Sequence, residues 1–361
     1  MLRIDLNRFG GVLVLVLGLW TGMAQAQEFR YRYVSLDQAQ LPPGFTLFFP
    51  AGINNSGRVY GTACDDFCAD PRLAFFNDGI VTVLQASGSV TTVNAGGTAG
   101  GFALDPQTFT LNAALLRGNT VEPIPPQPGE VFAVAFALND SGTALVLSFD
   151  GLSESYSLYR NGQTTLLDFG PTVTNPIFSL GTTQGNRSID NQGIIAGTTG
   201  DPFVDARAFR FDPRTGEATI LDPLPTEPLS WGLAINSRAD VLGYSFESRG
   251  LERIGVWDRS GTFTTYFVEG TSQFPTISNG LLFNDSNLIV ITDVSSPNSE
   301  VGNSYLVPKP GLRLNLADLV ANLPPGEDLS VISDMNDHGS MIGFSSLGSS
   351  FLLERVGGGS H

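Results

Sequence analysis

The sequence predicts an all-β fold built from repeated units, and three observations carry this prediction. A short motif of one apolar residue, Asn or Asp, and two spaced Gly residues returns along the whole chain. Gly, Pro, Asn and Ser interrupt the sequence every few residues, and no segment of useful length has the helical period. Each copy of the motif is followed by short apolar segments of strand length.

The motif is clearest at residues 53–61, Ile-Asn-Asn-Ser-Gly-Arg-Val-Tyr-Gly, and we call its Asn or Asp the anchor. The seven anchors are Asn54, Asn94, Asn139, Asp190, Asn236, Asn284 and Asn336. Successive anchors lie 40, 45, 51, 46, 48 and 52 residues apart. Repeats of this length are typical of solenoids and propellers.

The chemistry of the motif predicts a strand, a tight turn and a second strand. An anchor side chain can bond the backbone two residues on, and the position three after the anchor is Gly in five repeats. The other two repeats have Ala239 and Asn287 there, and Asn tolerates positive φ. The second Gly, seven after the anchor, predicts a bulge or a close backbone approach, although Val146 and Ile291 replace it in two repeats.

Each repeat then offers a third strand and a fourth strand, as at residues 73–77 and 80–84. Counterparts of the third strand occur at residues 113–116, 156–159, 207–211, 254–257, 304–307 and 350–353. Four antiparallel strands are one blade of a β-propeller.

The last repeat stops after its third strand, and residues 29–36 form a spare strand before the first anchor. Pairing the two would complete the last blade and remove the exposed edges of an open array. We therefore predict a closed seven-bladed β-propeller with four-stranded antiparallel blades over residues 27–356, preceded by a signal peptide at 1–26 and followed by a Gly-rich tail at 357–361.

The first 26 residues have the features of a secretory signal peptide. Arg3 and Arg8 flank a polar stretch, an apolar run covers residues 11–20, and Ala24-Gln25-Ala26 resembles a cleavage site. An uncleaved membrane anchor is the alternative, but the run is too short to span a bilayer comfortably. We expect a secreted or periplasmic protein with no membrane span after cleavage.

The net charge disfavours nucleic acid and anionic membranes as partners. Residues 27–361 hold 17 basic and 34 acidic residues, and 17 minus 34 gives a net charge of −17. We expect a monomer whose partner is a protein or a glycan.

The two cysteines, Cys64 and Cys68, predict a disulfide in an exported protein. Closing so short a loop would contribute about 2 kcal/mol. A metal site with Asp65, Asp66 and Asp70 is the alternative, but no His is near and the spacing matches no standard zinc framework.

No motif predicts a catalytic constellation, a cofactor or a metal. The histidines are His338, in an anchor turn, and His361, at the end of the chain. Residues that precede the anchors should line a central channel, and Asp334 and Arg187 are the charged exceptions among mostly small or apolar ones. We predict that this pair forms either a salt bridge or a contact to a small ligand at the channel mouth.

The anchor motif together with a third strand containing Ala-Phe, as at Ala74-Phe75 and Ala208-Phe209, resembles the extracellular HAF-repeat family of bacteria. The similarity spans nearly the whole chain after the signal peptide. The His that gives the family its name is absent from both Ala-Phe strands, and no surface-sorting tail is seen. The resemblance implies an exported propeller of largely unassigned function with no catalytic residues to transfer.

Three functions fit these observations. The leading hypothesis is a binding or scaffold module for a protein or a glycan. The alternatives are a polysaccharide-active enzyme with carboxylates near the channel, about 5 to 10 Å apart, and a structural component of the cell envelope. The fold alone does not choose among them.

Overall fold

The computed structural model describes residues 29–178, 187–201, 204–247, 252–269, 281–293 and 303–356. The predicted signal peptide and the Gly-rich tail lie outside the described residues. Nearly all regular structure in the described part of the chain is β-strand, and one short 3₁₀ helix, η2 (Ala317–Leu319), follows β23. No helix in this part is long and apolar enough to cross a membrane.

The strands form five hydrogen-bonded sheets. The first combines β1 (Tyr31–Ser35), β24 (Val331–Met335), β25 (Met341–Phe344) and β26 (Ser350–Arg355). The next contains β2 (Leu47–Ile53), β3 (Val59–Cys64), β4 (Arg72–Asn77), β5 (Ile80–Val93), β6 (Thr98–Leu104), β7 (Leu111–Arg117), β8 (Thr120–Pro123), β9 (Phe132–Leu138), β10 (Ala144–Phe149), β11 (Glu154–Arg160) and β12 (Gln163–Leu166).

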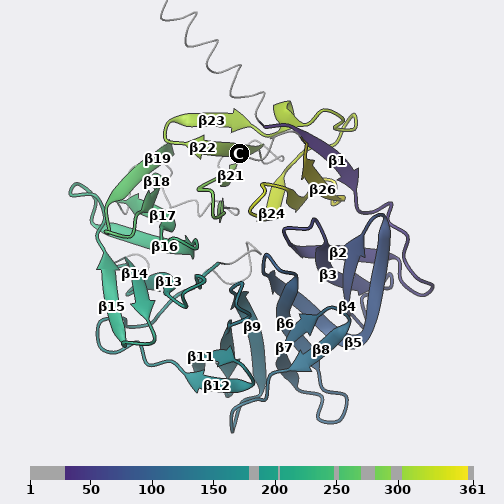
Figure 1. Ribbon diagram of the computed structural model, residues 1–361, viewed down its shortest axis with the longest axis horizontal. Helices are drawn as coiled ribbons and strands as arrows, with labels where there is room; N and C mark the ends of the chain where they lie inside the picture. The colour runs from purple at the N-terminus through teal and green to yellow at the C-terminus, as the bar shows by residue number, and fades with distance from the viewer. Residues whose placement is uncertain are drawn as a thin grey trace, which may run out of the picture.

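Three smaller sheets complete the fold. They are β13 (Ile195–Thr199), β14 (Arg207–Asp212) and β15 (Glu217–Leu221); β16 (Leu229–Ile235), β17 (Val241–Phe246), β18 (Glu252–Trp257) and β19 (Phe263–Glu269); and β20 (Leu281–Phe283), β21 (Ile289–Asp293), β22 (Asn303–Lys309) and β23 (Leu312–Asn315). Figure 1 shows the strands set in radial groups around a central axis.

The 11-stranded sheet joins three such groups. The first half of β5 pairs with β4 and its second half pairs with β6, so one long strand passes from one group to the next. A single parallel contact, Leu111 with Phe132, links β7 to β9. The groups are therefore β2–β5, β5–β8 and β9–β12.

The two ends of the chain meet in one sheet. β1 pairs antiparallel with β26, from Tyr31 opposite Arg355 to Ser35 opposite Phe351, and the purple and yellow ends lie side by side in Figure 1. The N–H of Val356 donates to the carbonyl of Arg30 at 2.8 Å. The spare N-terminal strand therefore completes the last sheet, as the sequence predicts.

Neighbouring groups pack through apolar faces. Between β9–β12 and β13–β15, aromatic rings fill the space, with Phe169 and Phe211 at 4.8 Å and Tyr156 and Phe178 at 4.9 Å between ring centroids. Aromatic pairs at such separations add to the free energy gained from burying their area. Packing of this kind holds each group against the next.

The anchor turns form as the sequence predicts. The residue three after the anchor has positive φ in every repeat, including Ala239 at 64° and Asn287 at 60°. The anchor oxygen accepts backbone N–H groups two and four residues on, as Asn54 does from Ser56 and Arg58. The left-handed conformation is therefore a property of the turn, which even an Ala adopts.

The second Gly of the motif lies opposite a β-bulge. The register of β2 and β3 shifts between Pro50 and Gly52, and a Cβ on Gly61 would lie 2.0 Å from the carbonyl oxygen of Phe49. Similar clashes of 2.0, 1.8 and 2.1 Å would arise at Gly101, Gly243 and Gly343. The predicted close approach is confirmed in these four repeats, whereas the bulge between β9 and β10 coexists with Val146.

Cys64 and Cys68 form the predicted disulfide, with Cα atoms 4.7 Å apart. It closes a loop at the end of β3. Within the described residues, no group of three or more His, Cys, Asp or Glu side chains is placed to hold a metal ion.

Candidate functional site

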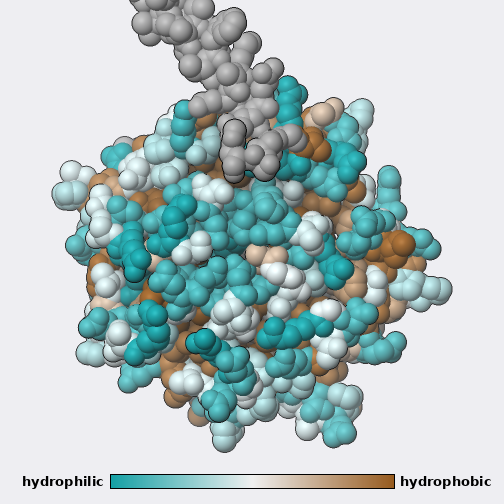
Figure 2. All heavy atoms as spheres, in the orientation of Figure 1, coloured by the Kyte–Doolittle hydropathy of each residue, from teal (hydrophilic) through white to brown (hydrophobic). Residues whose placement is uncertain are grey.

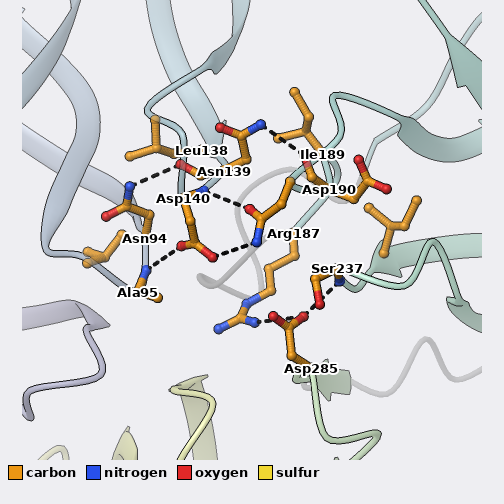
Figure 3. A pocket seen from close by; sticks show the side chains of 13 residues that line it. Asn94, Ala95, Leu138, Asn139, Asp140, Arg187, Ile189, Asp190, Ser237 and Asp285 are labelled. Carbon is orange, nitrogen blue, oxygen red and sulfur yellow. Dashed lines mark hydrogen bonds and ion pairs between the residues drawn. The ribbon is translucent and has the colours of Figure 1, made fainter.

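The anchor turns lie at the centre of the molecule, and several of them are bonded to one another. Where the anchor is Asn, its amide can donate to the carbonyl of the next anchor, as Asn94 does to Asn139 at 3.0 Å and Asn139 to Asp190 at 2.9 Å (Figure 3). Asn336 donates in the same way to Asn54 at 2.9 Å. The last repeat is thus bonded to the first at the axis, in addition to the pairing of the N-terminal strand β1 with β26.

The residues that directly follow the anchors form a second set of links, which we call the turn ring. Its members are Asn55, Ala95, Asp140, Asn191, Ser237, Asp285 and Asp337. The N–H of Ala95 donates to Asp140 at 2.8 Å, the N–H of Asp140 to Asn191 at 2.9 Å, and the N–H of Ser237 to Asp285 at 2.8 Å. Side-chain oxygens of one repeat therefore fix the backbone of the repeat before it.

The turn ring also joins the ends of the repeat array. The N–H of Asp337 donates to Asn55 at 3.0 Å, and the amide of Asn55 returns a bond to Asp337 at 3.0 Å. Hydrophilic residues gather around the centre of the face seen in Figure 2, in keeping with a polar axis.

Arg187 crosses toward this ring from the segment before the fourth anchor. Its guanidinium donates to Asp337 Oδ1 at 2.6 Å and lies 3.8 Å from Asp285 Oδ1, and its carbonyl accepts the N–H of Ile235 at 2.6 Å. Figure 3 shows the side chain reaching from the fourth anchor turn toward Asp285. Arg187 thus forms ion pairs with two carboxylates, Asp285 and Asp337, that belong to two other repeats.

The charges in this cluster suit ion pairing more than proton transfer. Burial would raise the pKa of Asp337, but the charge of Arg187 and the hydrogen bond from it outweigh burial and leave the pKa below its usual range. Burial also works against the charge on Arg187, yet the charge of Asp337 and its hydrogen bond keep the pKa of the guanidinium raised. Both groups stay ionised at neutral pH.

Asp334 lies deeper than Arg187. Its side chain belongs to β24, is 4% exposed, and accepts the N–H of Ile53 at 2.8 Å. Burial raises its pKa to about 6, although the Ile53 N–H and the charge of Arg187 act in the opposite direction. Asp334 therefore links the last sheet to β2, and the structure brings it into the same charged region as Arg187 without a direct ion pair between them.

Asp190 differs from the other anchors because it has no amide to donate. Its Oδ1 accepts the N–H groups of Gln192 and Ile194, both at 2.8 Å, while its Oδ2 is buried without a hydrogen-bond partner. Burial raises the pKa of this carboxyl. Arg187 precedes this atypical anchor by three residues.

One small cavity lies at the axis among the described residues. The cavity shown in Figure 3 is lined by Asn94, Asp140, Arg187, Asp190 and Asp285 among others and has a volume of about 20 Å³. A space of this size holds about one water molecule.

A roomier cavity of about 660 Å³ lies farther out, between β10–β12 and β13–β15. Its lining mixes the apolar side chains of Leu158 and Phe211 with Arg160, Asp168 and Arg214. Its volume falls in the range of small-molecule sites.

The raised pKa of Asp334 predicts a specific dependence of stability on pH. The ordinary pKa of an Asp is about 3.9, so Asp334 binds more protons in the folded than in the unfolded state between about pH 4 and pH 6. Its contribution to stability is complete below about pH 4 and is lost as the pH rises through about 6. Asp334→Asn keeps an acceptor for Ile53 and cannot ionise.

We expect Asp334→Asn to stabilise the protein more at pH 8 than at pH 4, by about 2 to 3 kcal/mol, since one pKa unit corresponds to about 1.4 kcal/mol. Urea unfolding of both proteins at the two pH values measures this difference. An equal effect at both values would show that Asp334 ionises normally in the folded protein.

Sequence reasoning missed the turn ring. It singled out Asp334 and Arg187 but not Asp285 or Asp337. The available signal was that six of the seven residues directly after the anchors have a polar side chain, the exception being Ala95. Whether any of these residues contacts a ligand stays a prediction.

No protein-family model matches the chain, and no curated protein matches it. Among solved structures, the β-propeller domain of the trilobed protease from Pyrococcus furiosus aligns with a TM-score of 0.53 and 9% identity over 87% of this chain and 99% of that one. A prolyl endopeptidase aligns with a TM-score of 0.51 and 9% identity over 93% of this chain and 52% of that one.

TolB from Acinetobacter baumannii aligns with a TM-score of 0.37 and 14% identity over 63% of this chain and 55% of its own length. This chain thus spans about half of the TolB and prolyl endopeptidase chains. The alignment with the Pyrococcus β-propeller domain, at a TM-score above 0.5, shows that the chain has a β-propeller fold. The Pyrococcus domain is described as having an open velcro topology, whereas in this chain β1 pairs with β26.

Proposed function

We propose that this protein is a closed seven-bladed β-propeller that acts as a binding or scaffold module outside the cytoplasm. The observation that carries the proposal is that the polar groups at the axis bond one another. Arg187 forms an ion pair with Asp337, and several members of the turn ring bond one another. Such an axis supports a rigid platform that presents its outer surfaces to a partner.

The anchors together with the sheets support the count of seven. Six of the seven anchors directly follow a strand, and the seventh, Asp190, follows the isolated bridge residue Ile189. The 11-stranded sheet contains three of these repeats. The groups β13–β15, β16–β19 and β20–β23 and the sheet of β1 with β24–β26 supply the other four. The bonds of Asn336 to Asn54 and of Asp337 to Asn55 support closure of the ring.

The polysaccharide-active enzyme fits the axis less well. Asp285 and Asp337 are close enough to serve as an acid and base pair, but both face the same Arg187. The charge of Arg187 and its hydrogen bond hold the pKa of Asp337 below its usual range despite burial, whereas a glycosidase needs one carboxyl of the pair protonated. Asp334 has a pKa suited to a general acid, yet it is 4% exposed and already bonded to Ile53.

Export and membership of the HAF-repeat family belong to the same proposal. They are supported by the signal-like first 26 residues, by the anchor and Ala-Phe motifs, and by the disulfide between Cys64 and Cys68. Disulfides persist mainly in oxidising compartments.

The test is a binding screen of the purified protein against a glycan array and against an extract of its own cell envelope. We expect saturable binding that Arg187→Ala retains, together with no release of reducing ends from a polysaccharide panel. Hydrolysis that Asp337→Asn or Asp334→Asn abolishes would replace the binding role with the enzymatic one. A lack of binding to both the array and the extract would leave the structural role.

A further inference from the structure

The loops that join the second and third strands of the repeats lie at the end of the blades opposite the anchors. The pairing of β2 with β3 shows this, because Ile53 and Val59 meet at the anchor turn while Leu47 and Cys64 meet at the other end. Within each group the strands are antiparallel, and the groups have the same orientation around the axis. These loops therefore gather on one side of the molecule. We call this side the loop face.

The most exposed large apolar side chains of the described residues lie at the tips of these loops. They are Leu152, Phe67 and Phe109, with exposed fractions of 94%, 90% and 77%, followed by Val204 at 75% and Leu347 at 74%. Each comes from a different repeat. The corresponding loops after β17 and β21 lie outside the described residues.

The first three tips come from three consecutive groups of the 11-stranded sheet. Further exposed apolar side chains lie at the strand ends beside them. We define the tip patch as Leu47, Phe49, Phe67, Phe109, Val131, Phe149 and Leu152. Single exposed apolar residues are ordinary, but several on one side of the molecule, from the loops of consecutive groups, are typical of an interaction surface.

The loops of the tip patch are held in shape by carboxylates at their first residues. Asp65 accepts the N–H of Phe67 at 3.1 Å, and Asp150 accepts the N–H of Leu152 at 2.8 Å. The N–H of Phe109 donates to the carbonyl of Asp105 at 2.8 Å. The disulfide fixes the first loop as well. Loops ordered in advance lose less conformational entropy when a partner binds.

The surroundings of the tip patch are acidic. The loops and strand ends at residues 45–49, 63–72, 102–112, 128–132 and 147–155 contain seven acidic residues and one basic residue. The acids are Asp65, Asp66, Asp70, Asp105, Glu130, Asp150 and Glu154, and the base is Arg72. Backbone N–H groups lower the pKa of Asp105 and Asp150, so both carboxylates persist at neutral pH.

We propose that the tip patch docks a protein partner whose contact surface combines basic side chains with apolar side chains, as a basic amphipathic helix does. This inference rests on the proposed binding function and names its site. The apolar tips would be buried against apolar side chains of the partner. The acidic surroundings would attract and orient the basic side chains of the partner. An anionic lipid surface would be repelled by the seven acids, and a second copy would bring the same charges to the interface.

The test uses the full protein and a labelled 14-residue peptide of Lys and Leu whose Leu residues lie on one helical face. Matched peptides replace Leu by Ser or Lys by Glu. We expect binding of the Lys/Leu peptide alone, weakened by salt, in fluorescence anisotropy titrations. The triple variant with Phe67→Ser, Phe109→Ser and Leu152→Ser, which we call the tip variant, should bind the Lys/Leu peptide at least about tenfold more weakly.

A control variant substitutes exposed apolar residues away from the loop face, Ile80→Ser, Leu166→Ser and Val356→Ser, and should bind like the unmodified protein. Circular dichroism and the melting temperature confirm that both variants fold. Equal binding by the tip variant, or absence of binding by the Lys/Leu peptide, overturns the proposal. Capture of the protein by phosphatidylcholine vesicles, or self-association that the tip variant abolishes, overturns it in favour of a lipid or a second copy.

Binding to the envelope extract distinguishes failure of the tip patch as a site from failure of the proposed binding function. If the unmodified protein and the tip variant bind the extract equally, the binding function stands and the tip patch is the wrong site. If neither binds, the binding function itself fails.

Discussion

Tyr31→Ala is expected to lower the free energy of unfolding by about 3 to 5 kcal/mol, the usual cost of truncating a fully buried aromatic residue. Tyr31 is 0% exposed in β1, the strand that completes the sheet of the last repeat. It packs in a cluster with Leu316, Val320 and Leu353, so the cavity left by Ala would weaken the junction between the two ends of the chain. Urea unfolding measures the loss.

Two variants serve as controls for Tyr31. Its hydroxyl is buried without a hydrogen-bond partner, so Tyr31→Phe should leave stability unchanged or raise it. Arg32 is the next residue in β1, with a side chain 61% exposed, and Arg32→Ala should change stability by less than about 1 kcal/mol. If Tyr31→Ala behaved like Arg32→Ala, the N-terminal strand would not contribute to the folded state.

Gly243→Ala is expected to destabilise the protein by at least about 3 kcal/mol, at the upper end of the cost of overpacking. A Cβ there would lie 1.8 Å from the carbonyl oxygen of Trp231 and 2.9 Å from the Trp257 ring. The obstacle is backbone in a bulged strand pair, so it cannot move aside as a side chain would. The melting temperature and urea unfolding both report this change.

Gly96 provides the matched substitution. A Cβ added to Gly96 would lie 3.7 Å from its nearest neighbour, the side-chain oxygen of Asn94, which is an ordinary contact. The φ of Gly96 is not in the positive region that disfavours other residues. Gly96→Ala should therefore be neutral or stabilising by up to about 1 kcal/mol. A similar loss in both variants would mean that the clash at Gly243 relaxes easily.

The local chemistry of the repeats could be predicted from the sequence because it resides in single residues. The anchor oxygen and the positive φ three residues on recur even where Gly is replaced by Ala239 or Asn287. The need for Gly at positions such as Gly61 and Gly343 also follows from one backbone contact each. The pairing of β1 with β26 followed from a missing strand at one end and a spare strand at the other.

The charged cluster and the tip patch could not be predicted, because both depend on how repeats are rotated against one another. Asp285 and Asp337 are 52 residues apart in the sequence, yet both reach Arg187. Leu152 and Phe109 occur in polar loops whose sequences do not state on which side of the molecule they emerge. Side-chain identities within a repeat carry no information on that rotation.

The bond between Val356 and Arg30 places the two ends of the described chain within one hydrogen bond of each other. If the ring is closed as proposed, this bond and the links from Asn336 to Asn54 and from Asp337 to Asn55 make the fold resemble a circular polymer cut at one point. Where the cut falls is then incidental to the architecture. The cyclic order of the repeats defines the molecule, and a chain that started at a different repeat and ran through the same order would satisfy the same contacts.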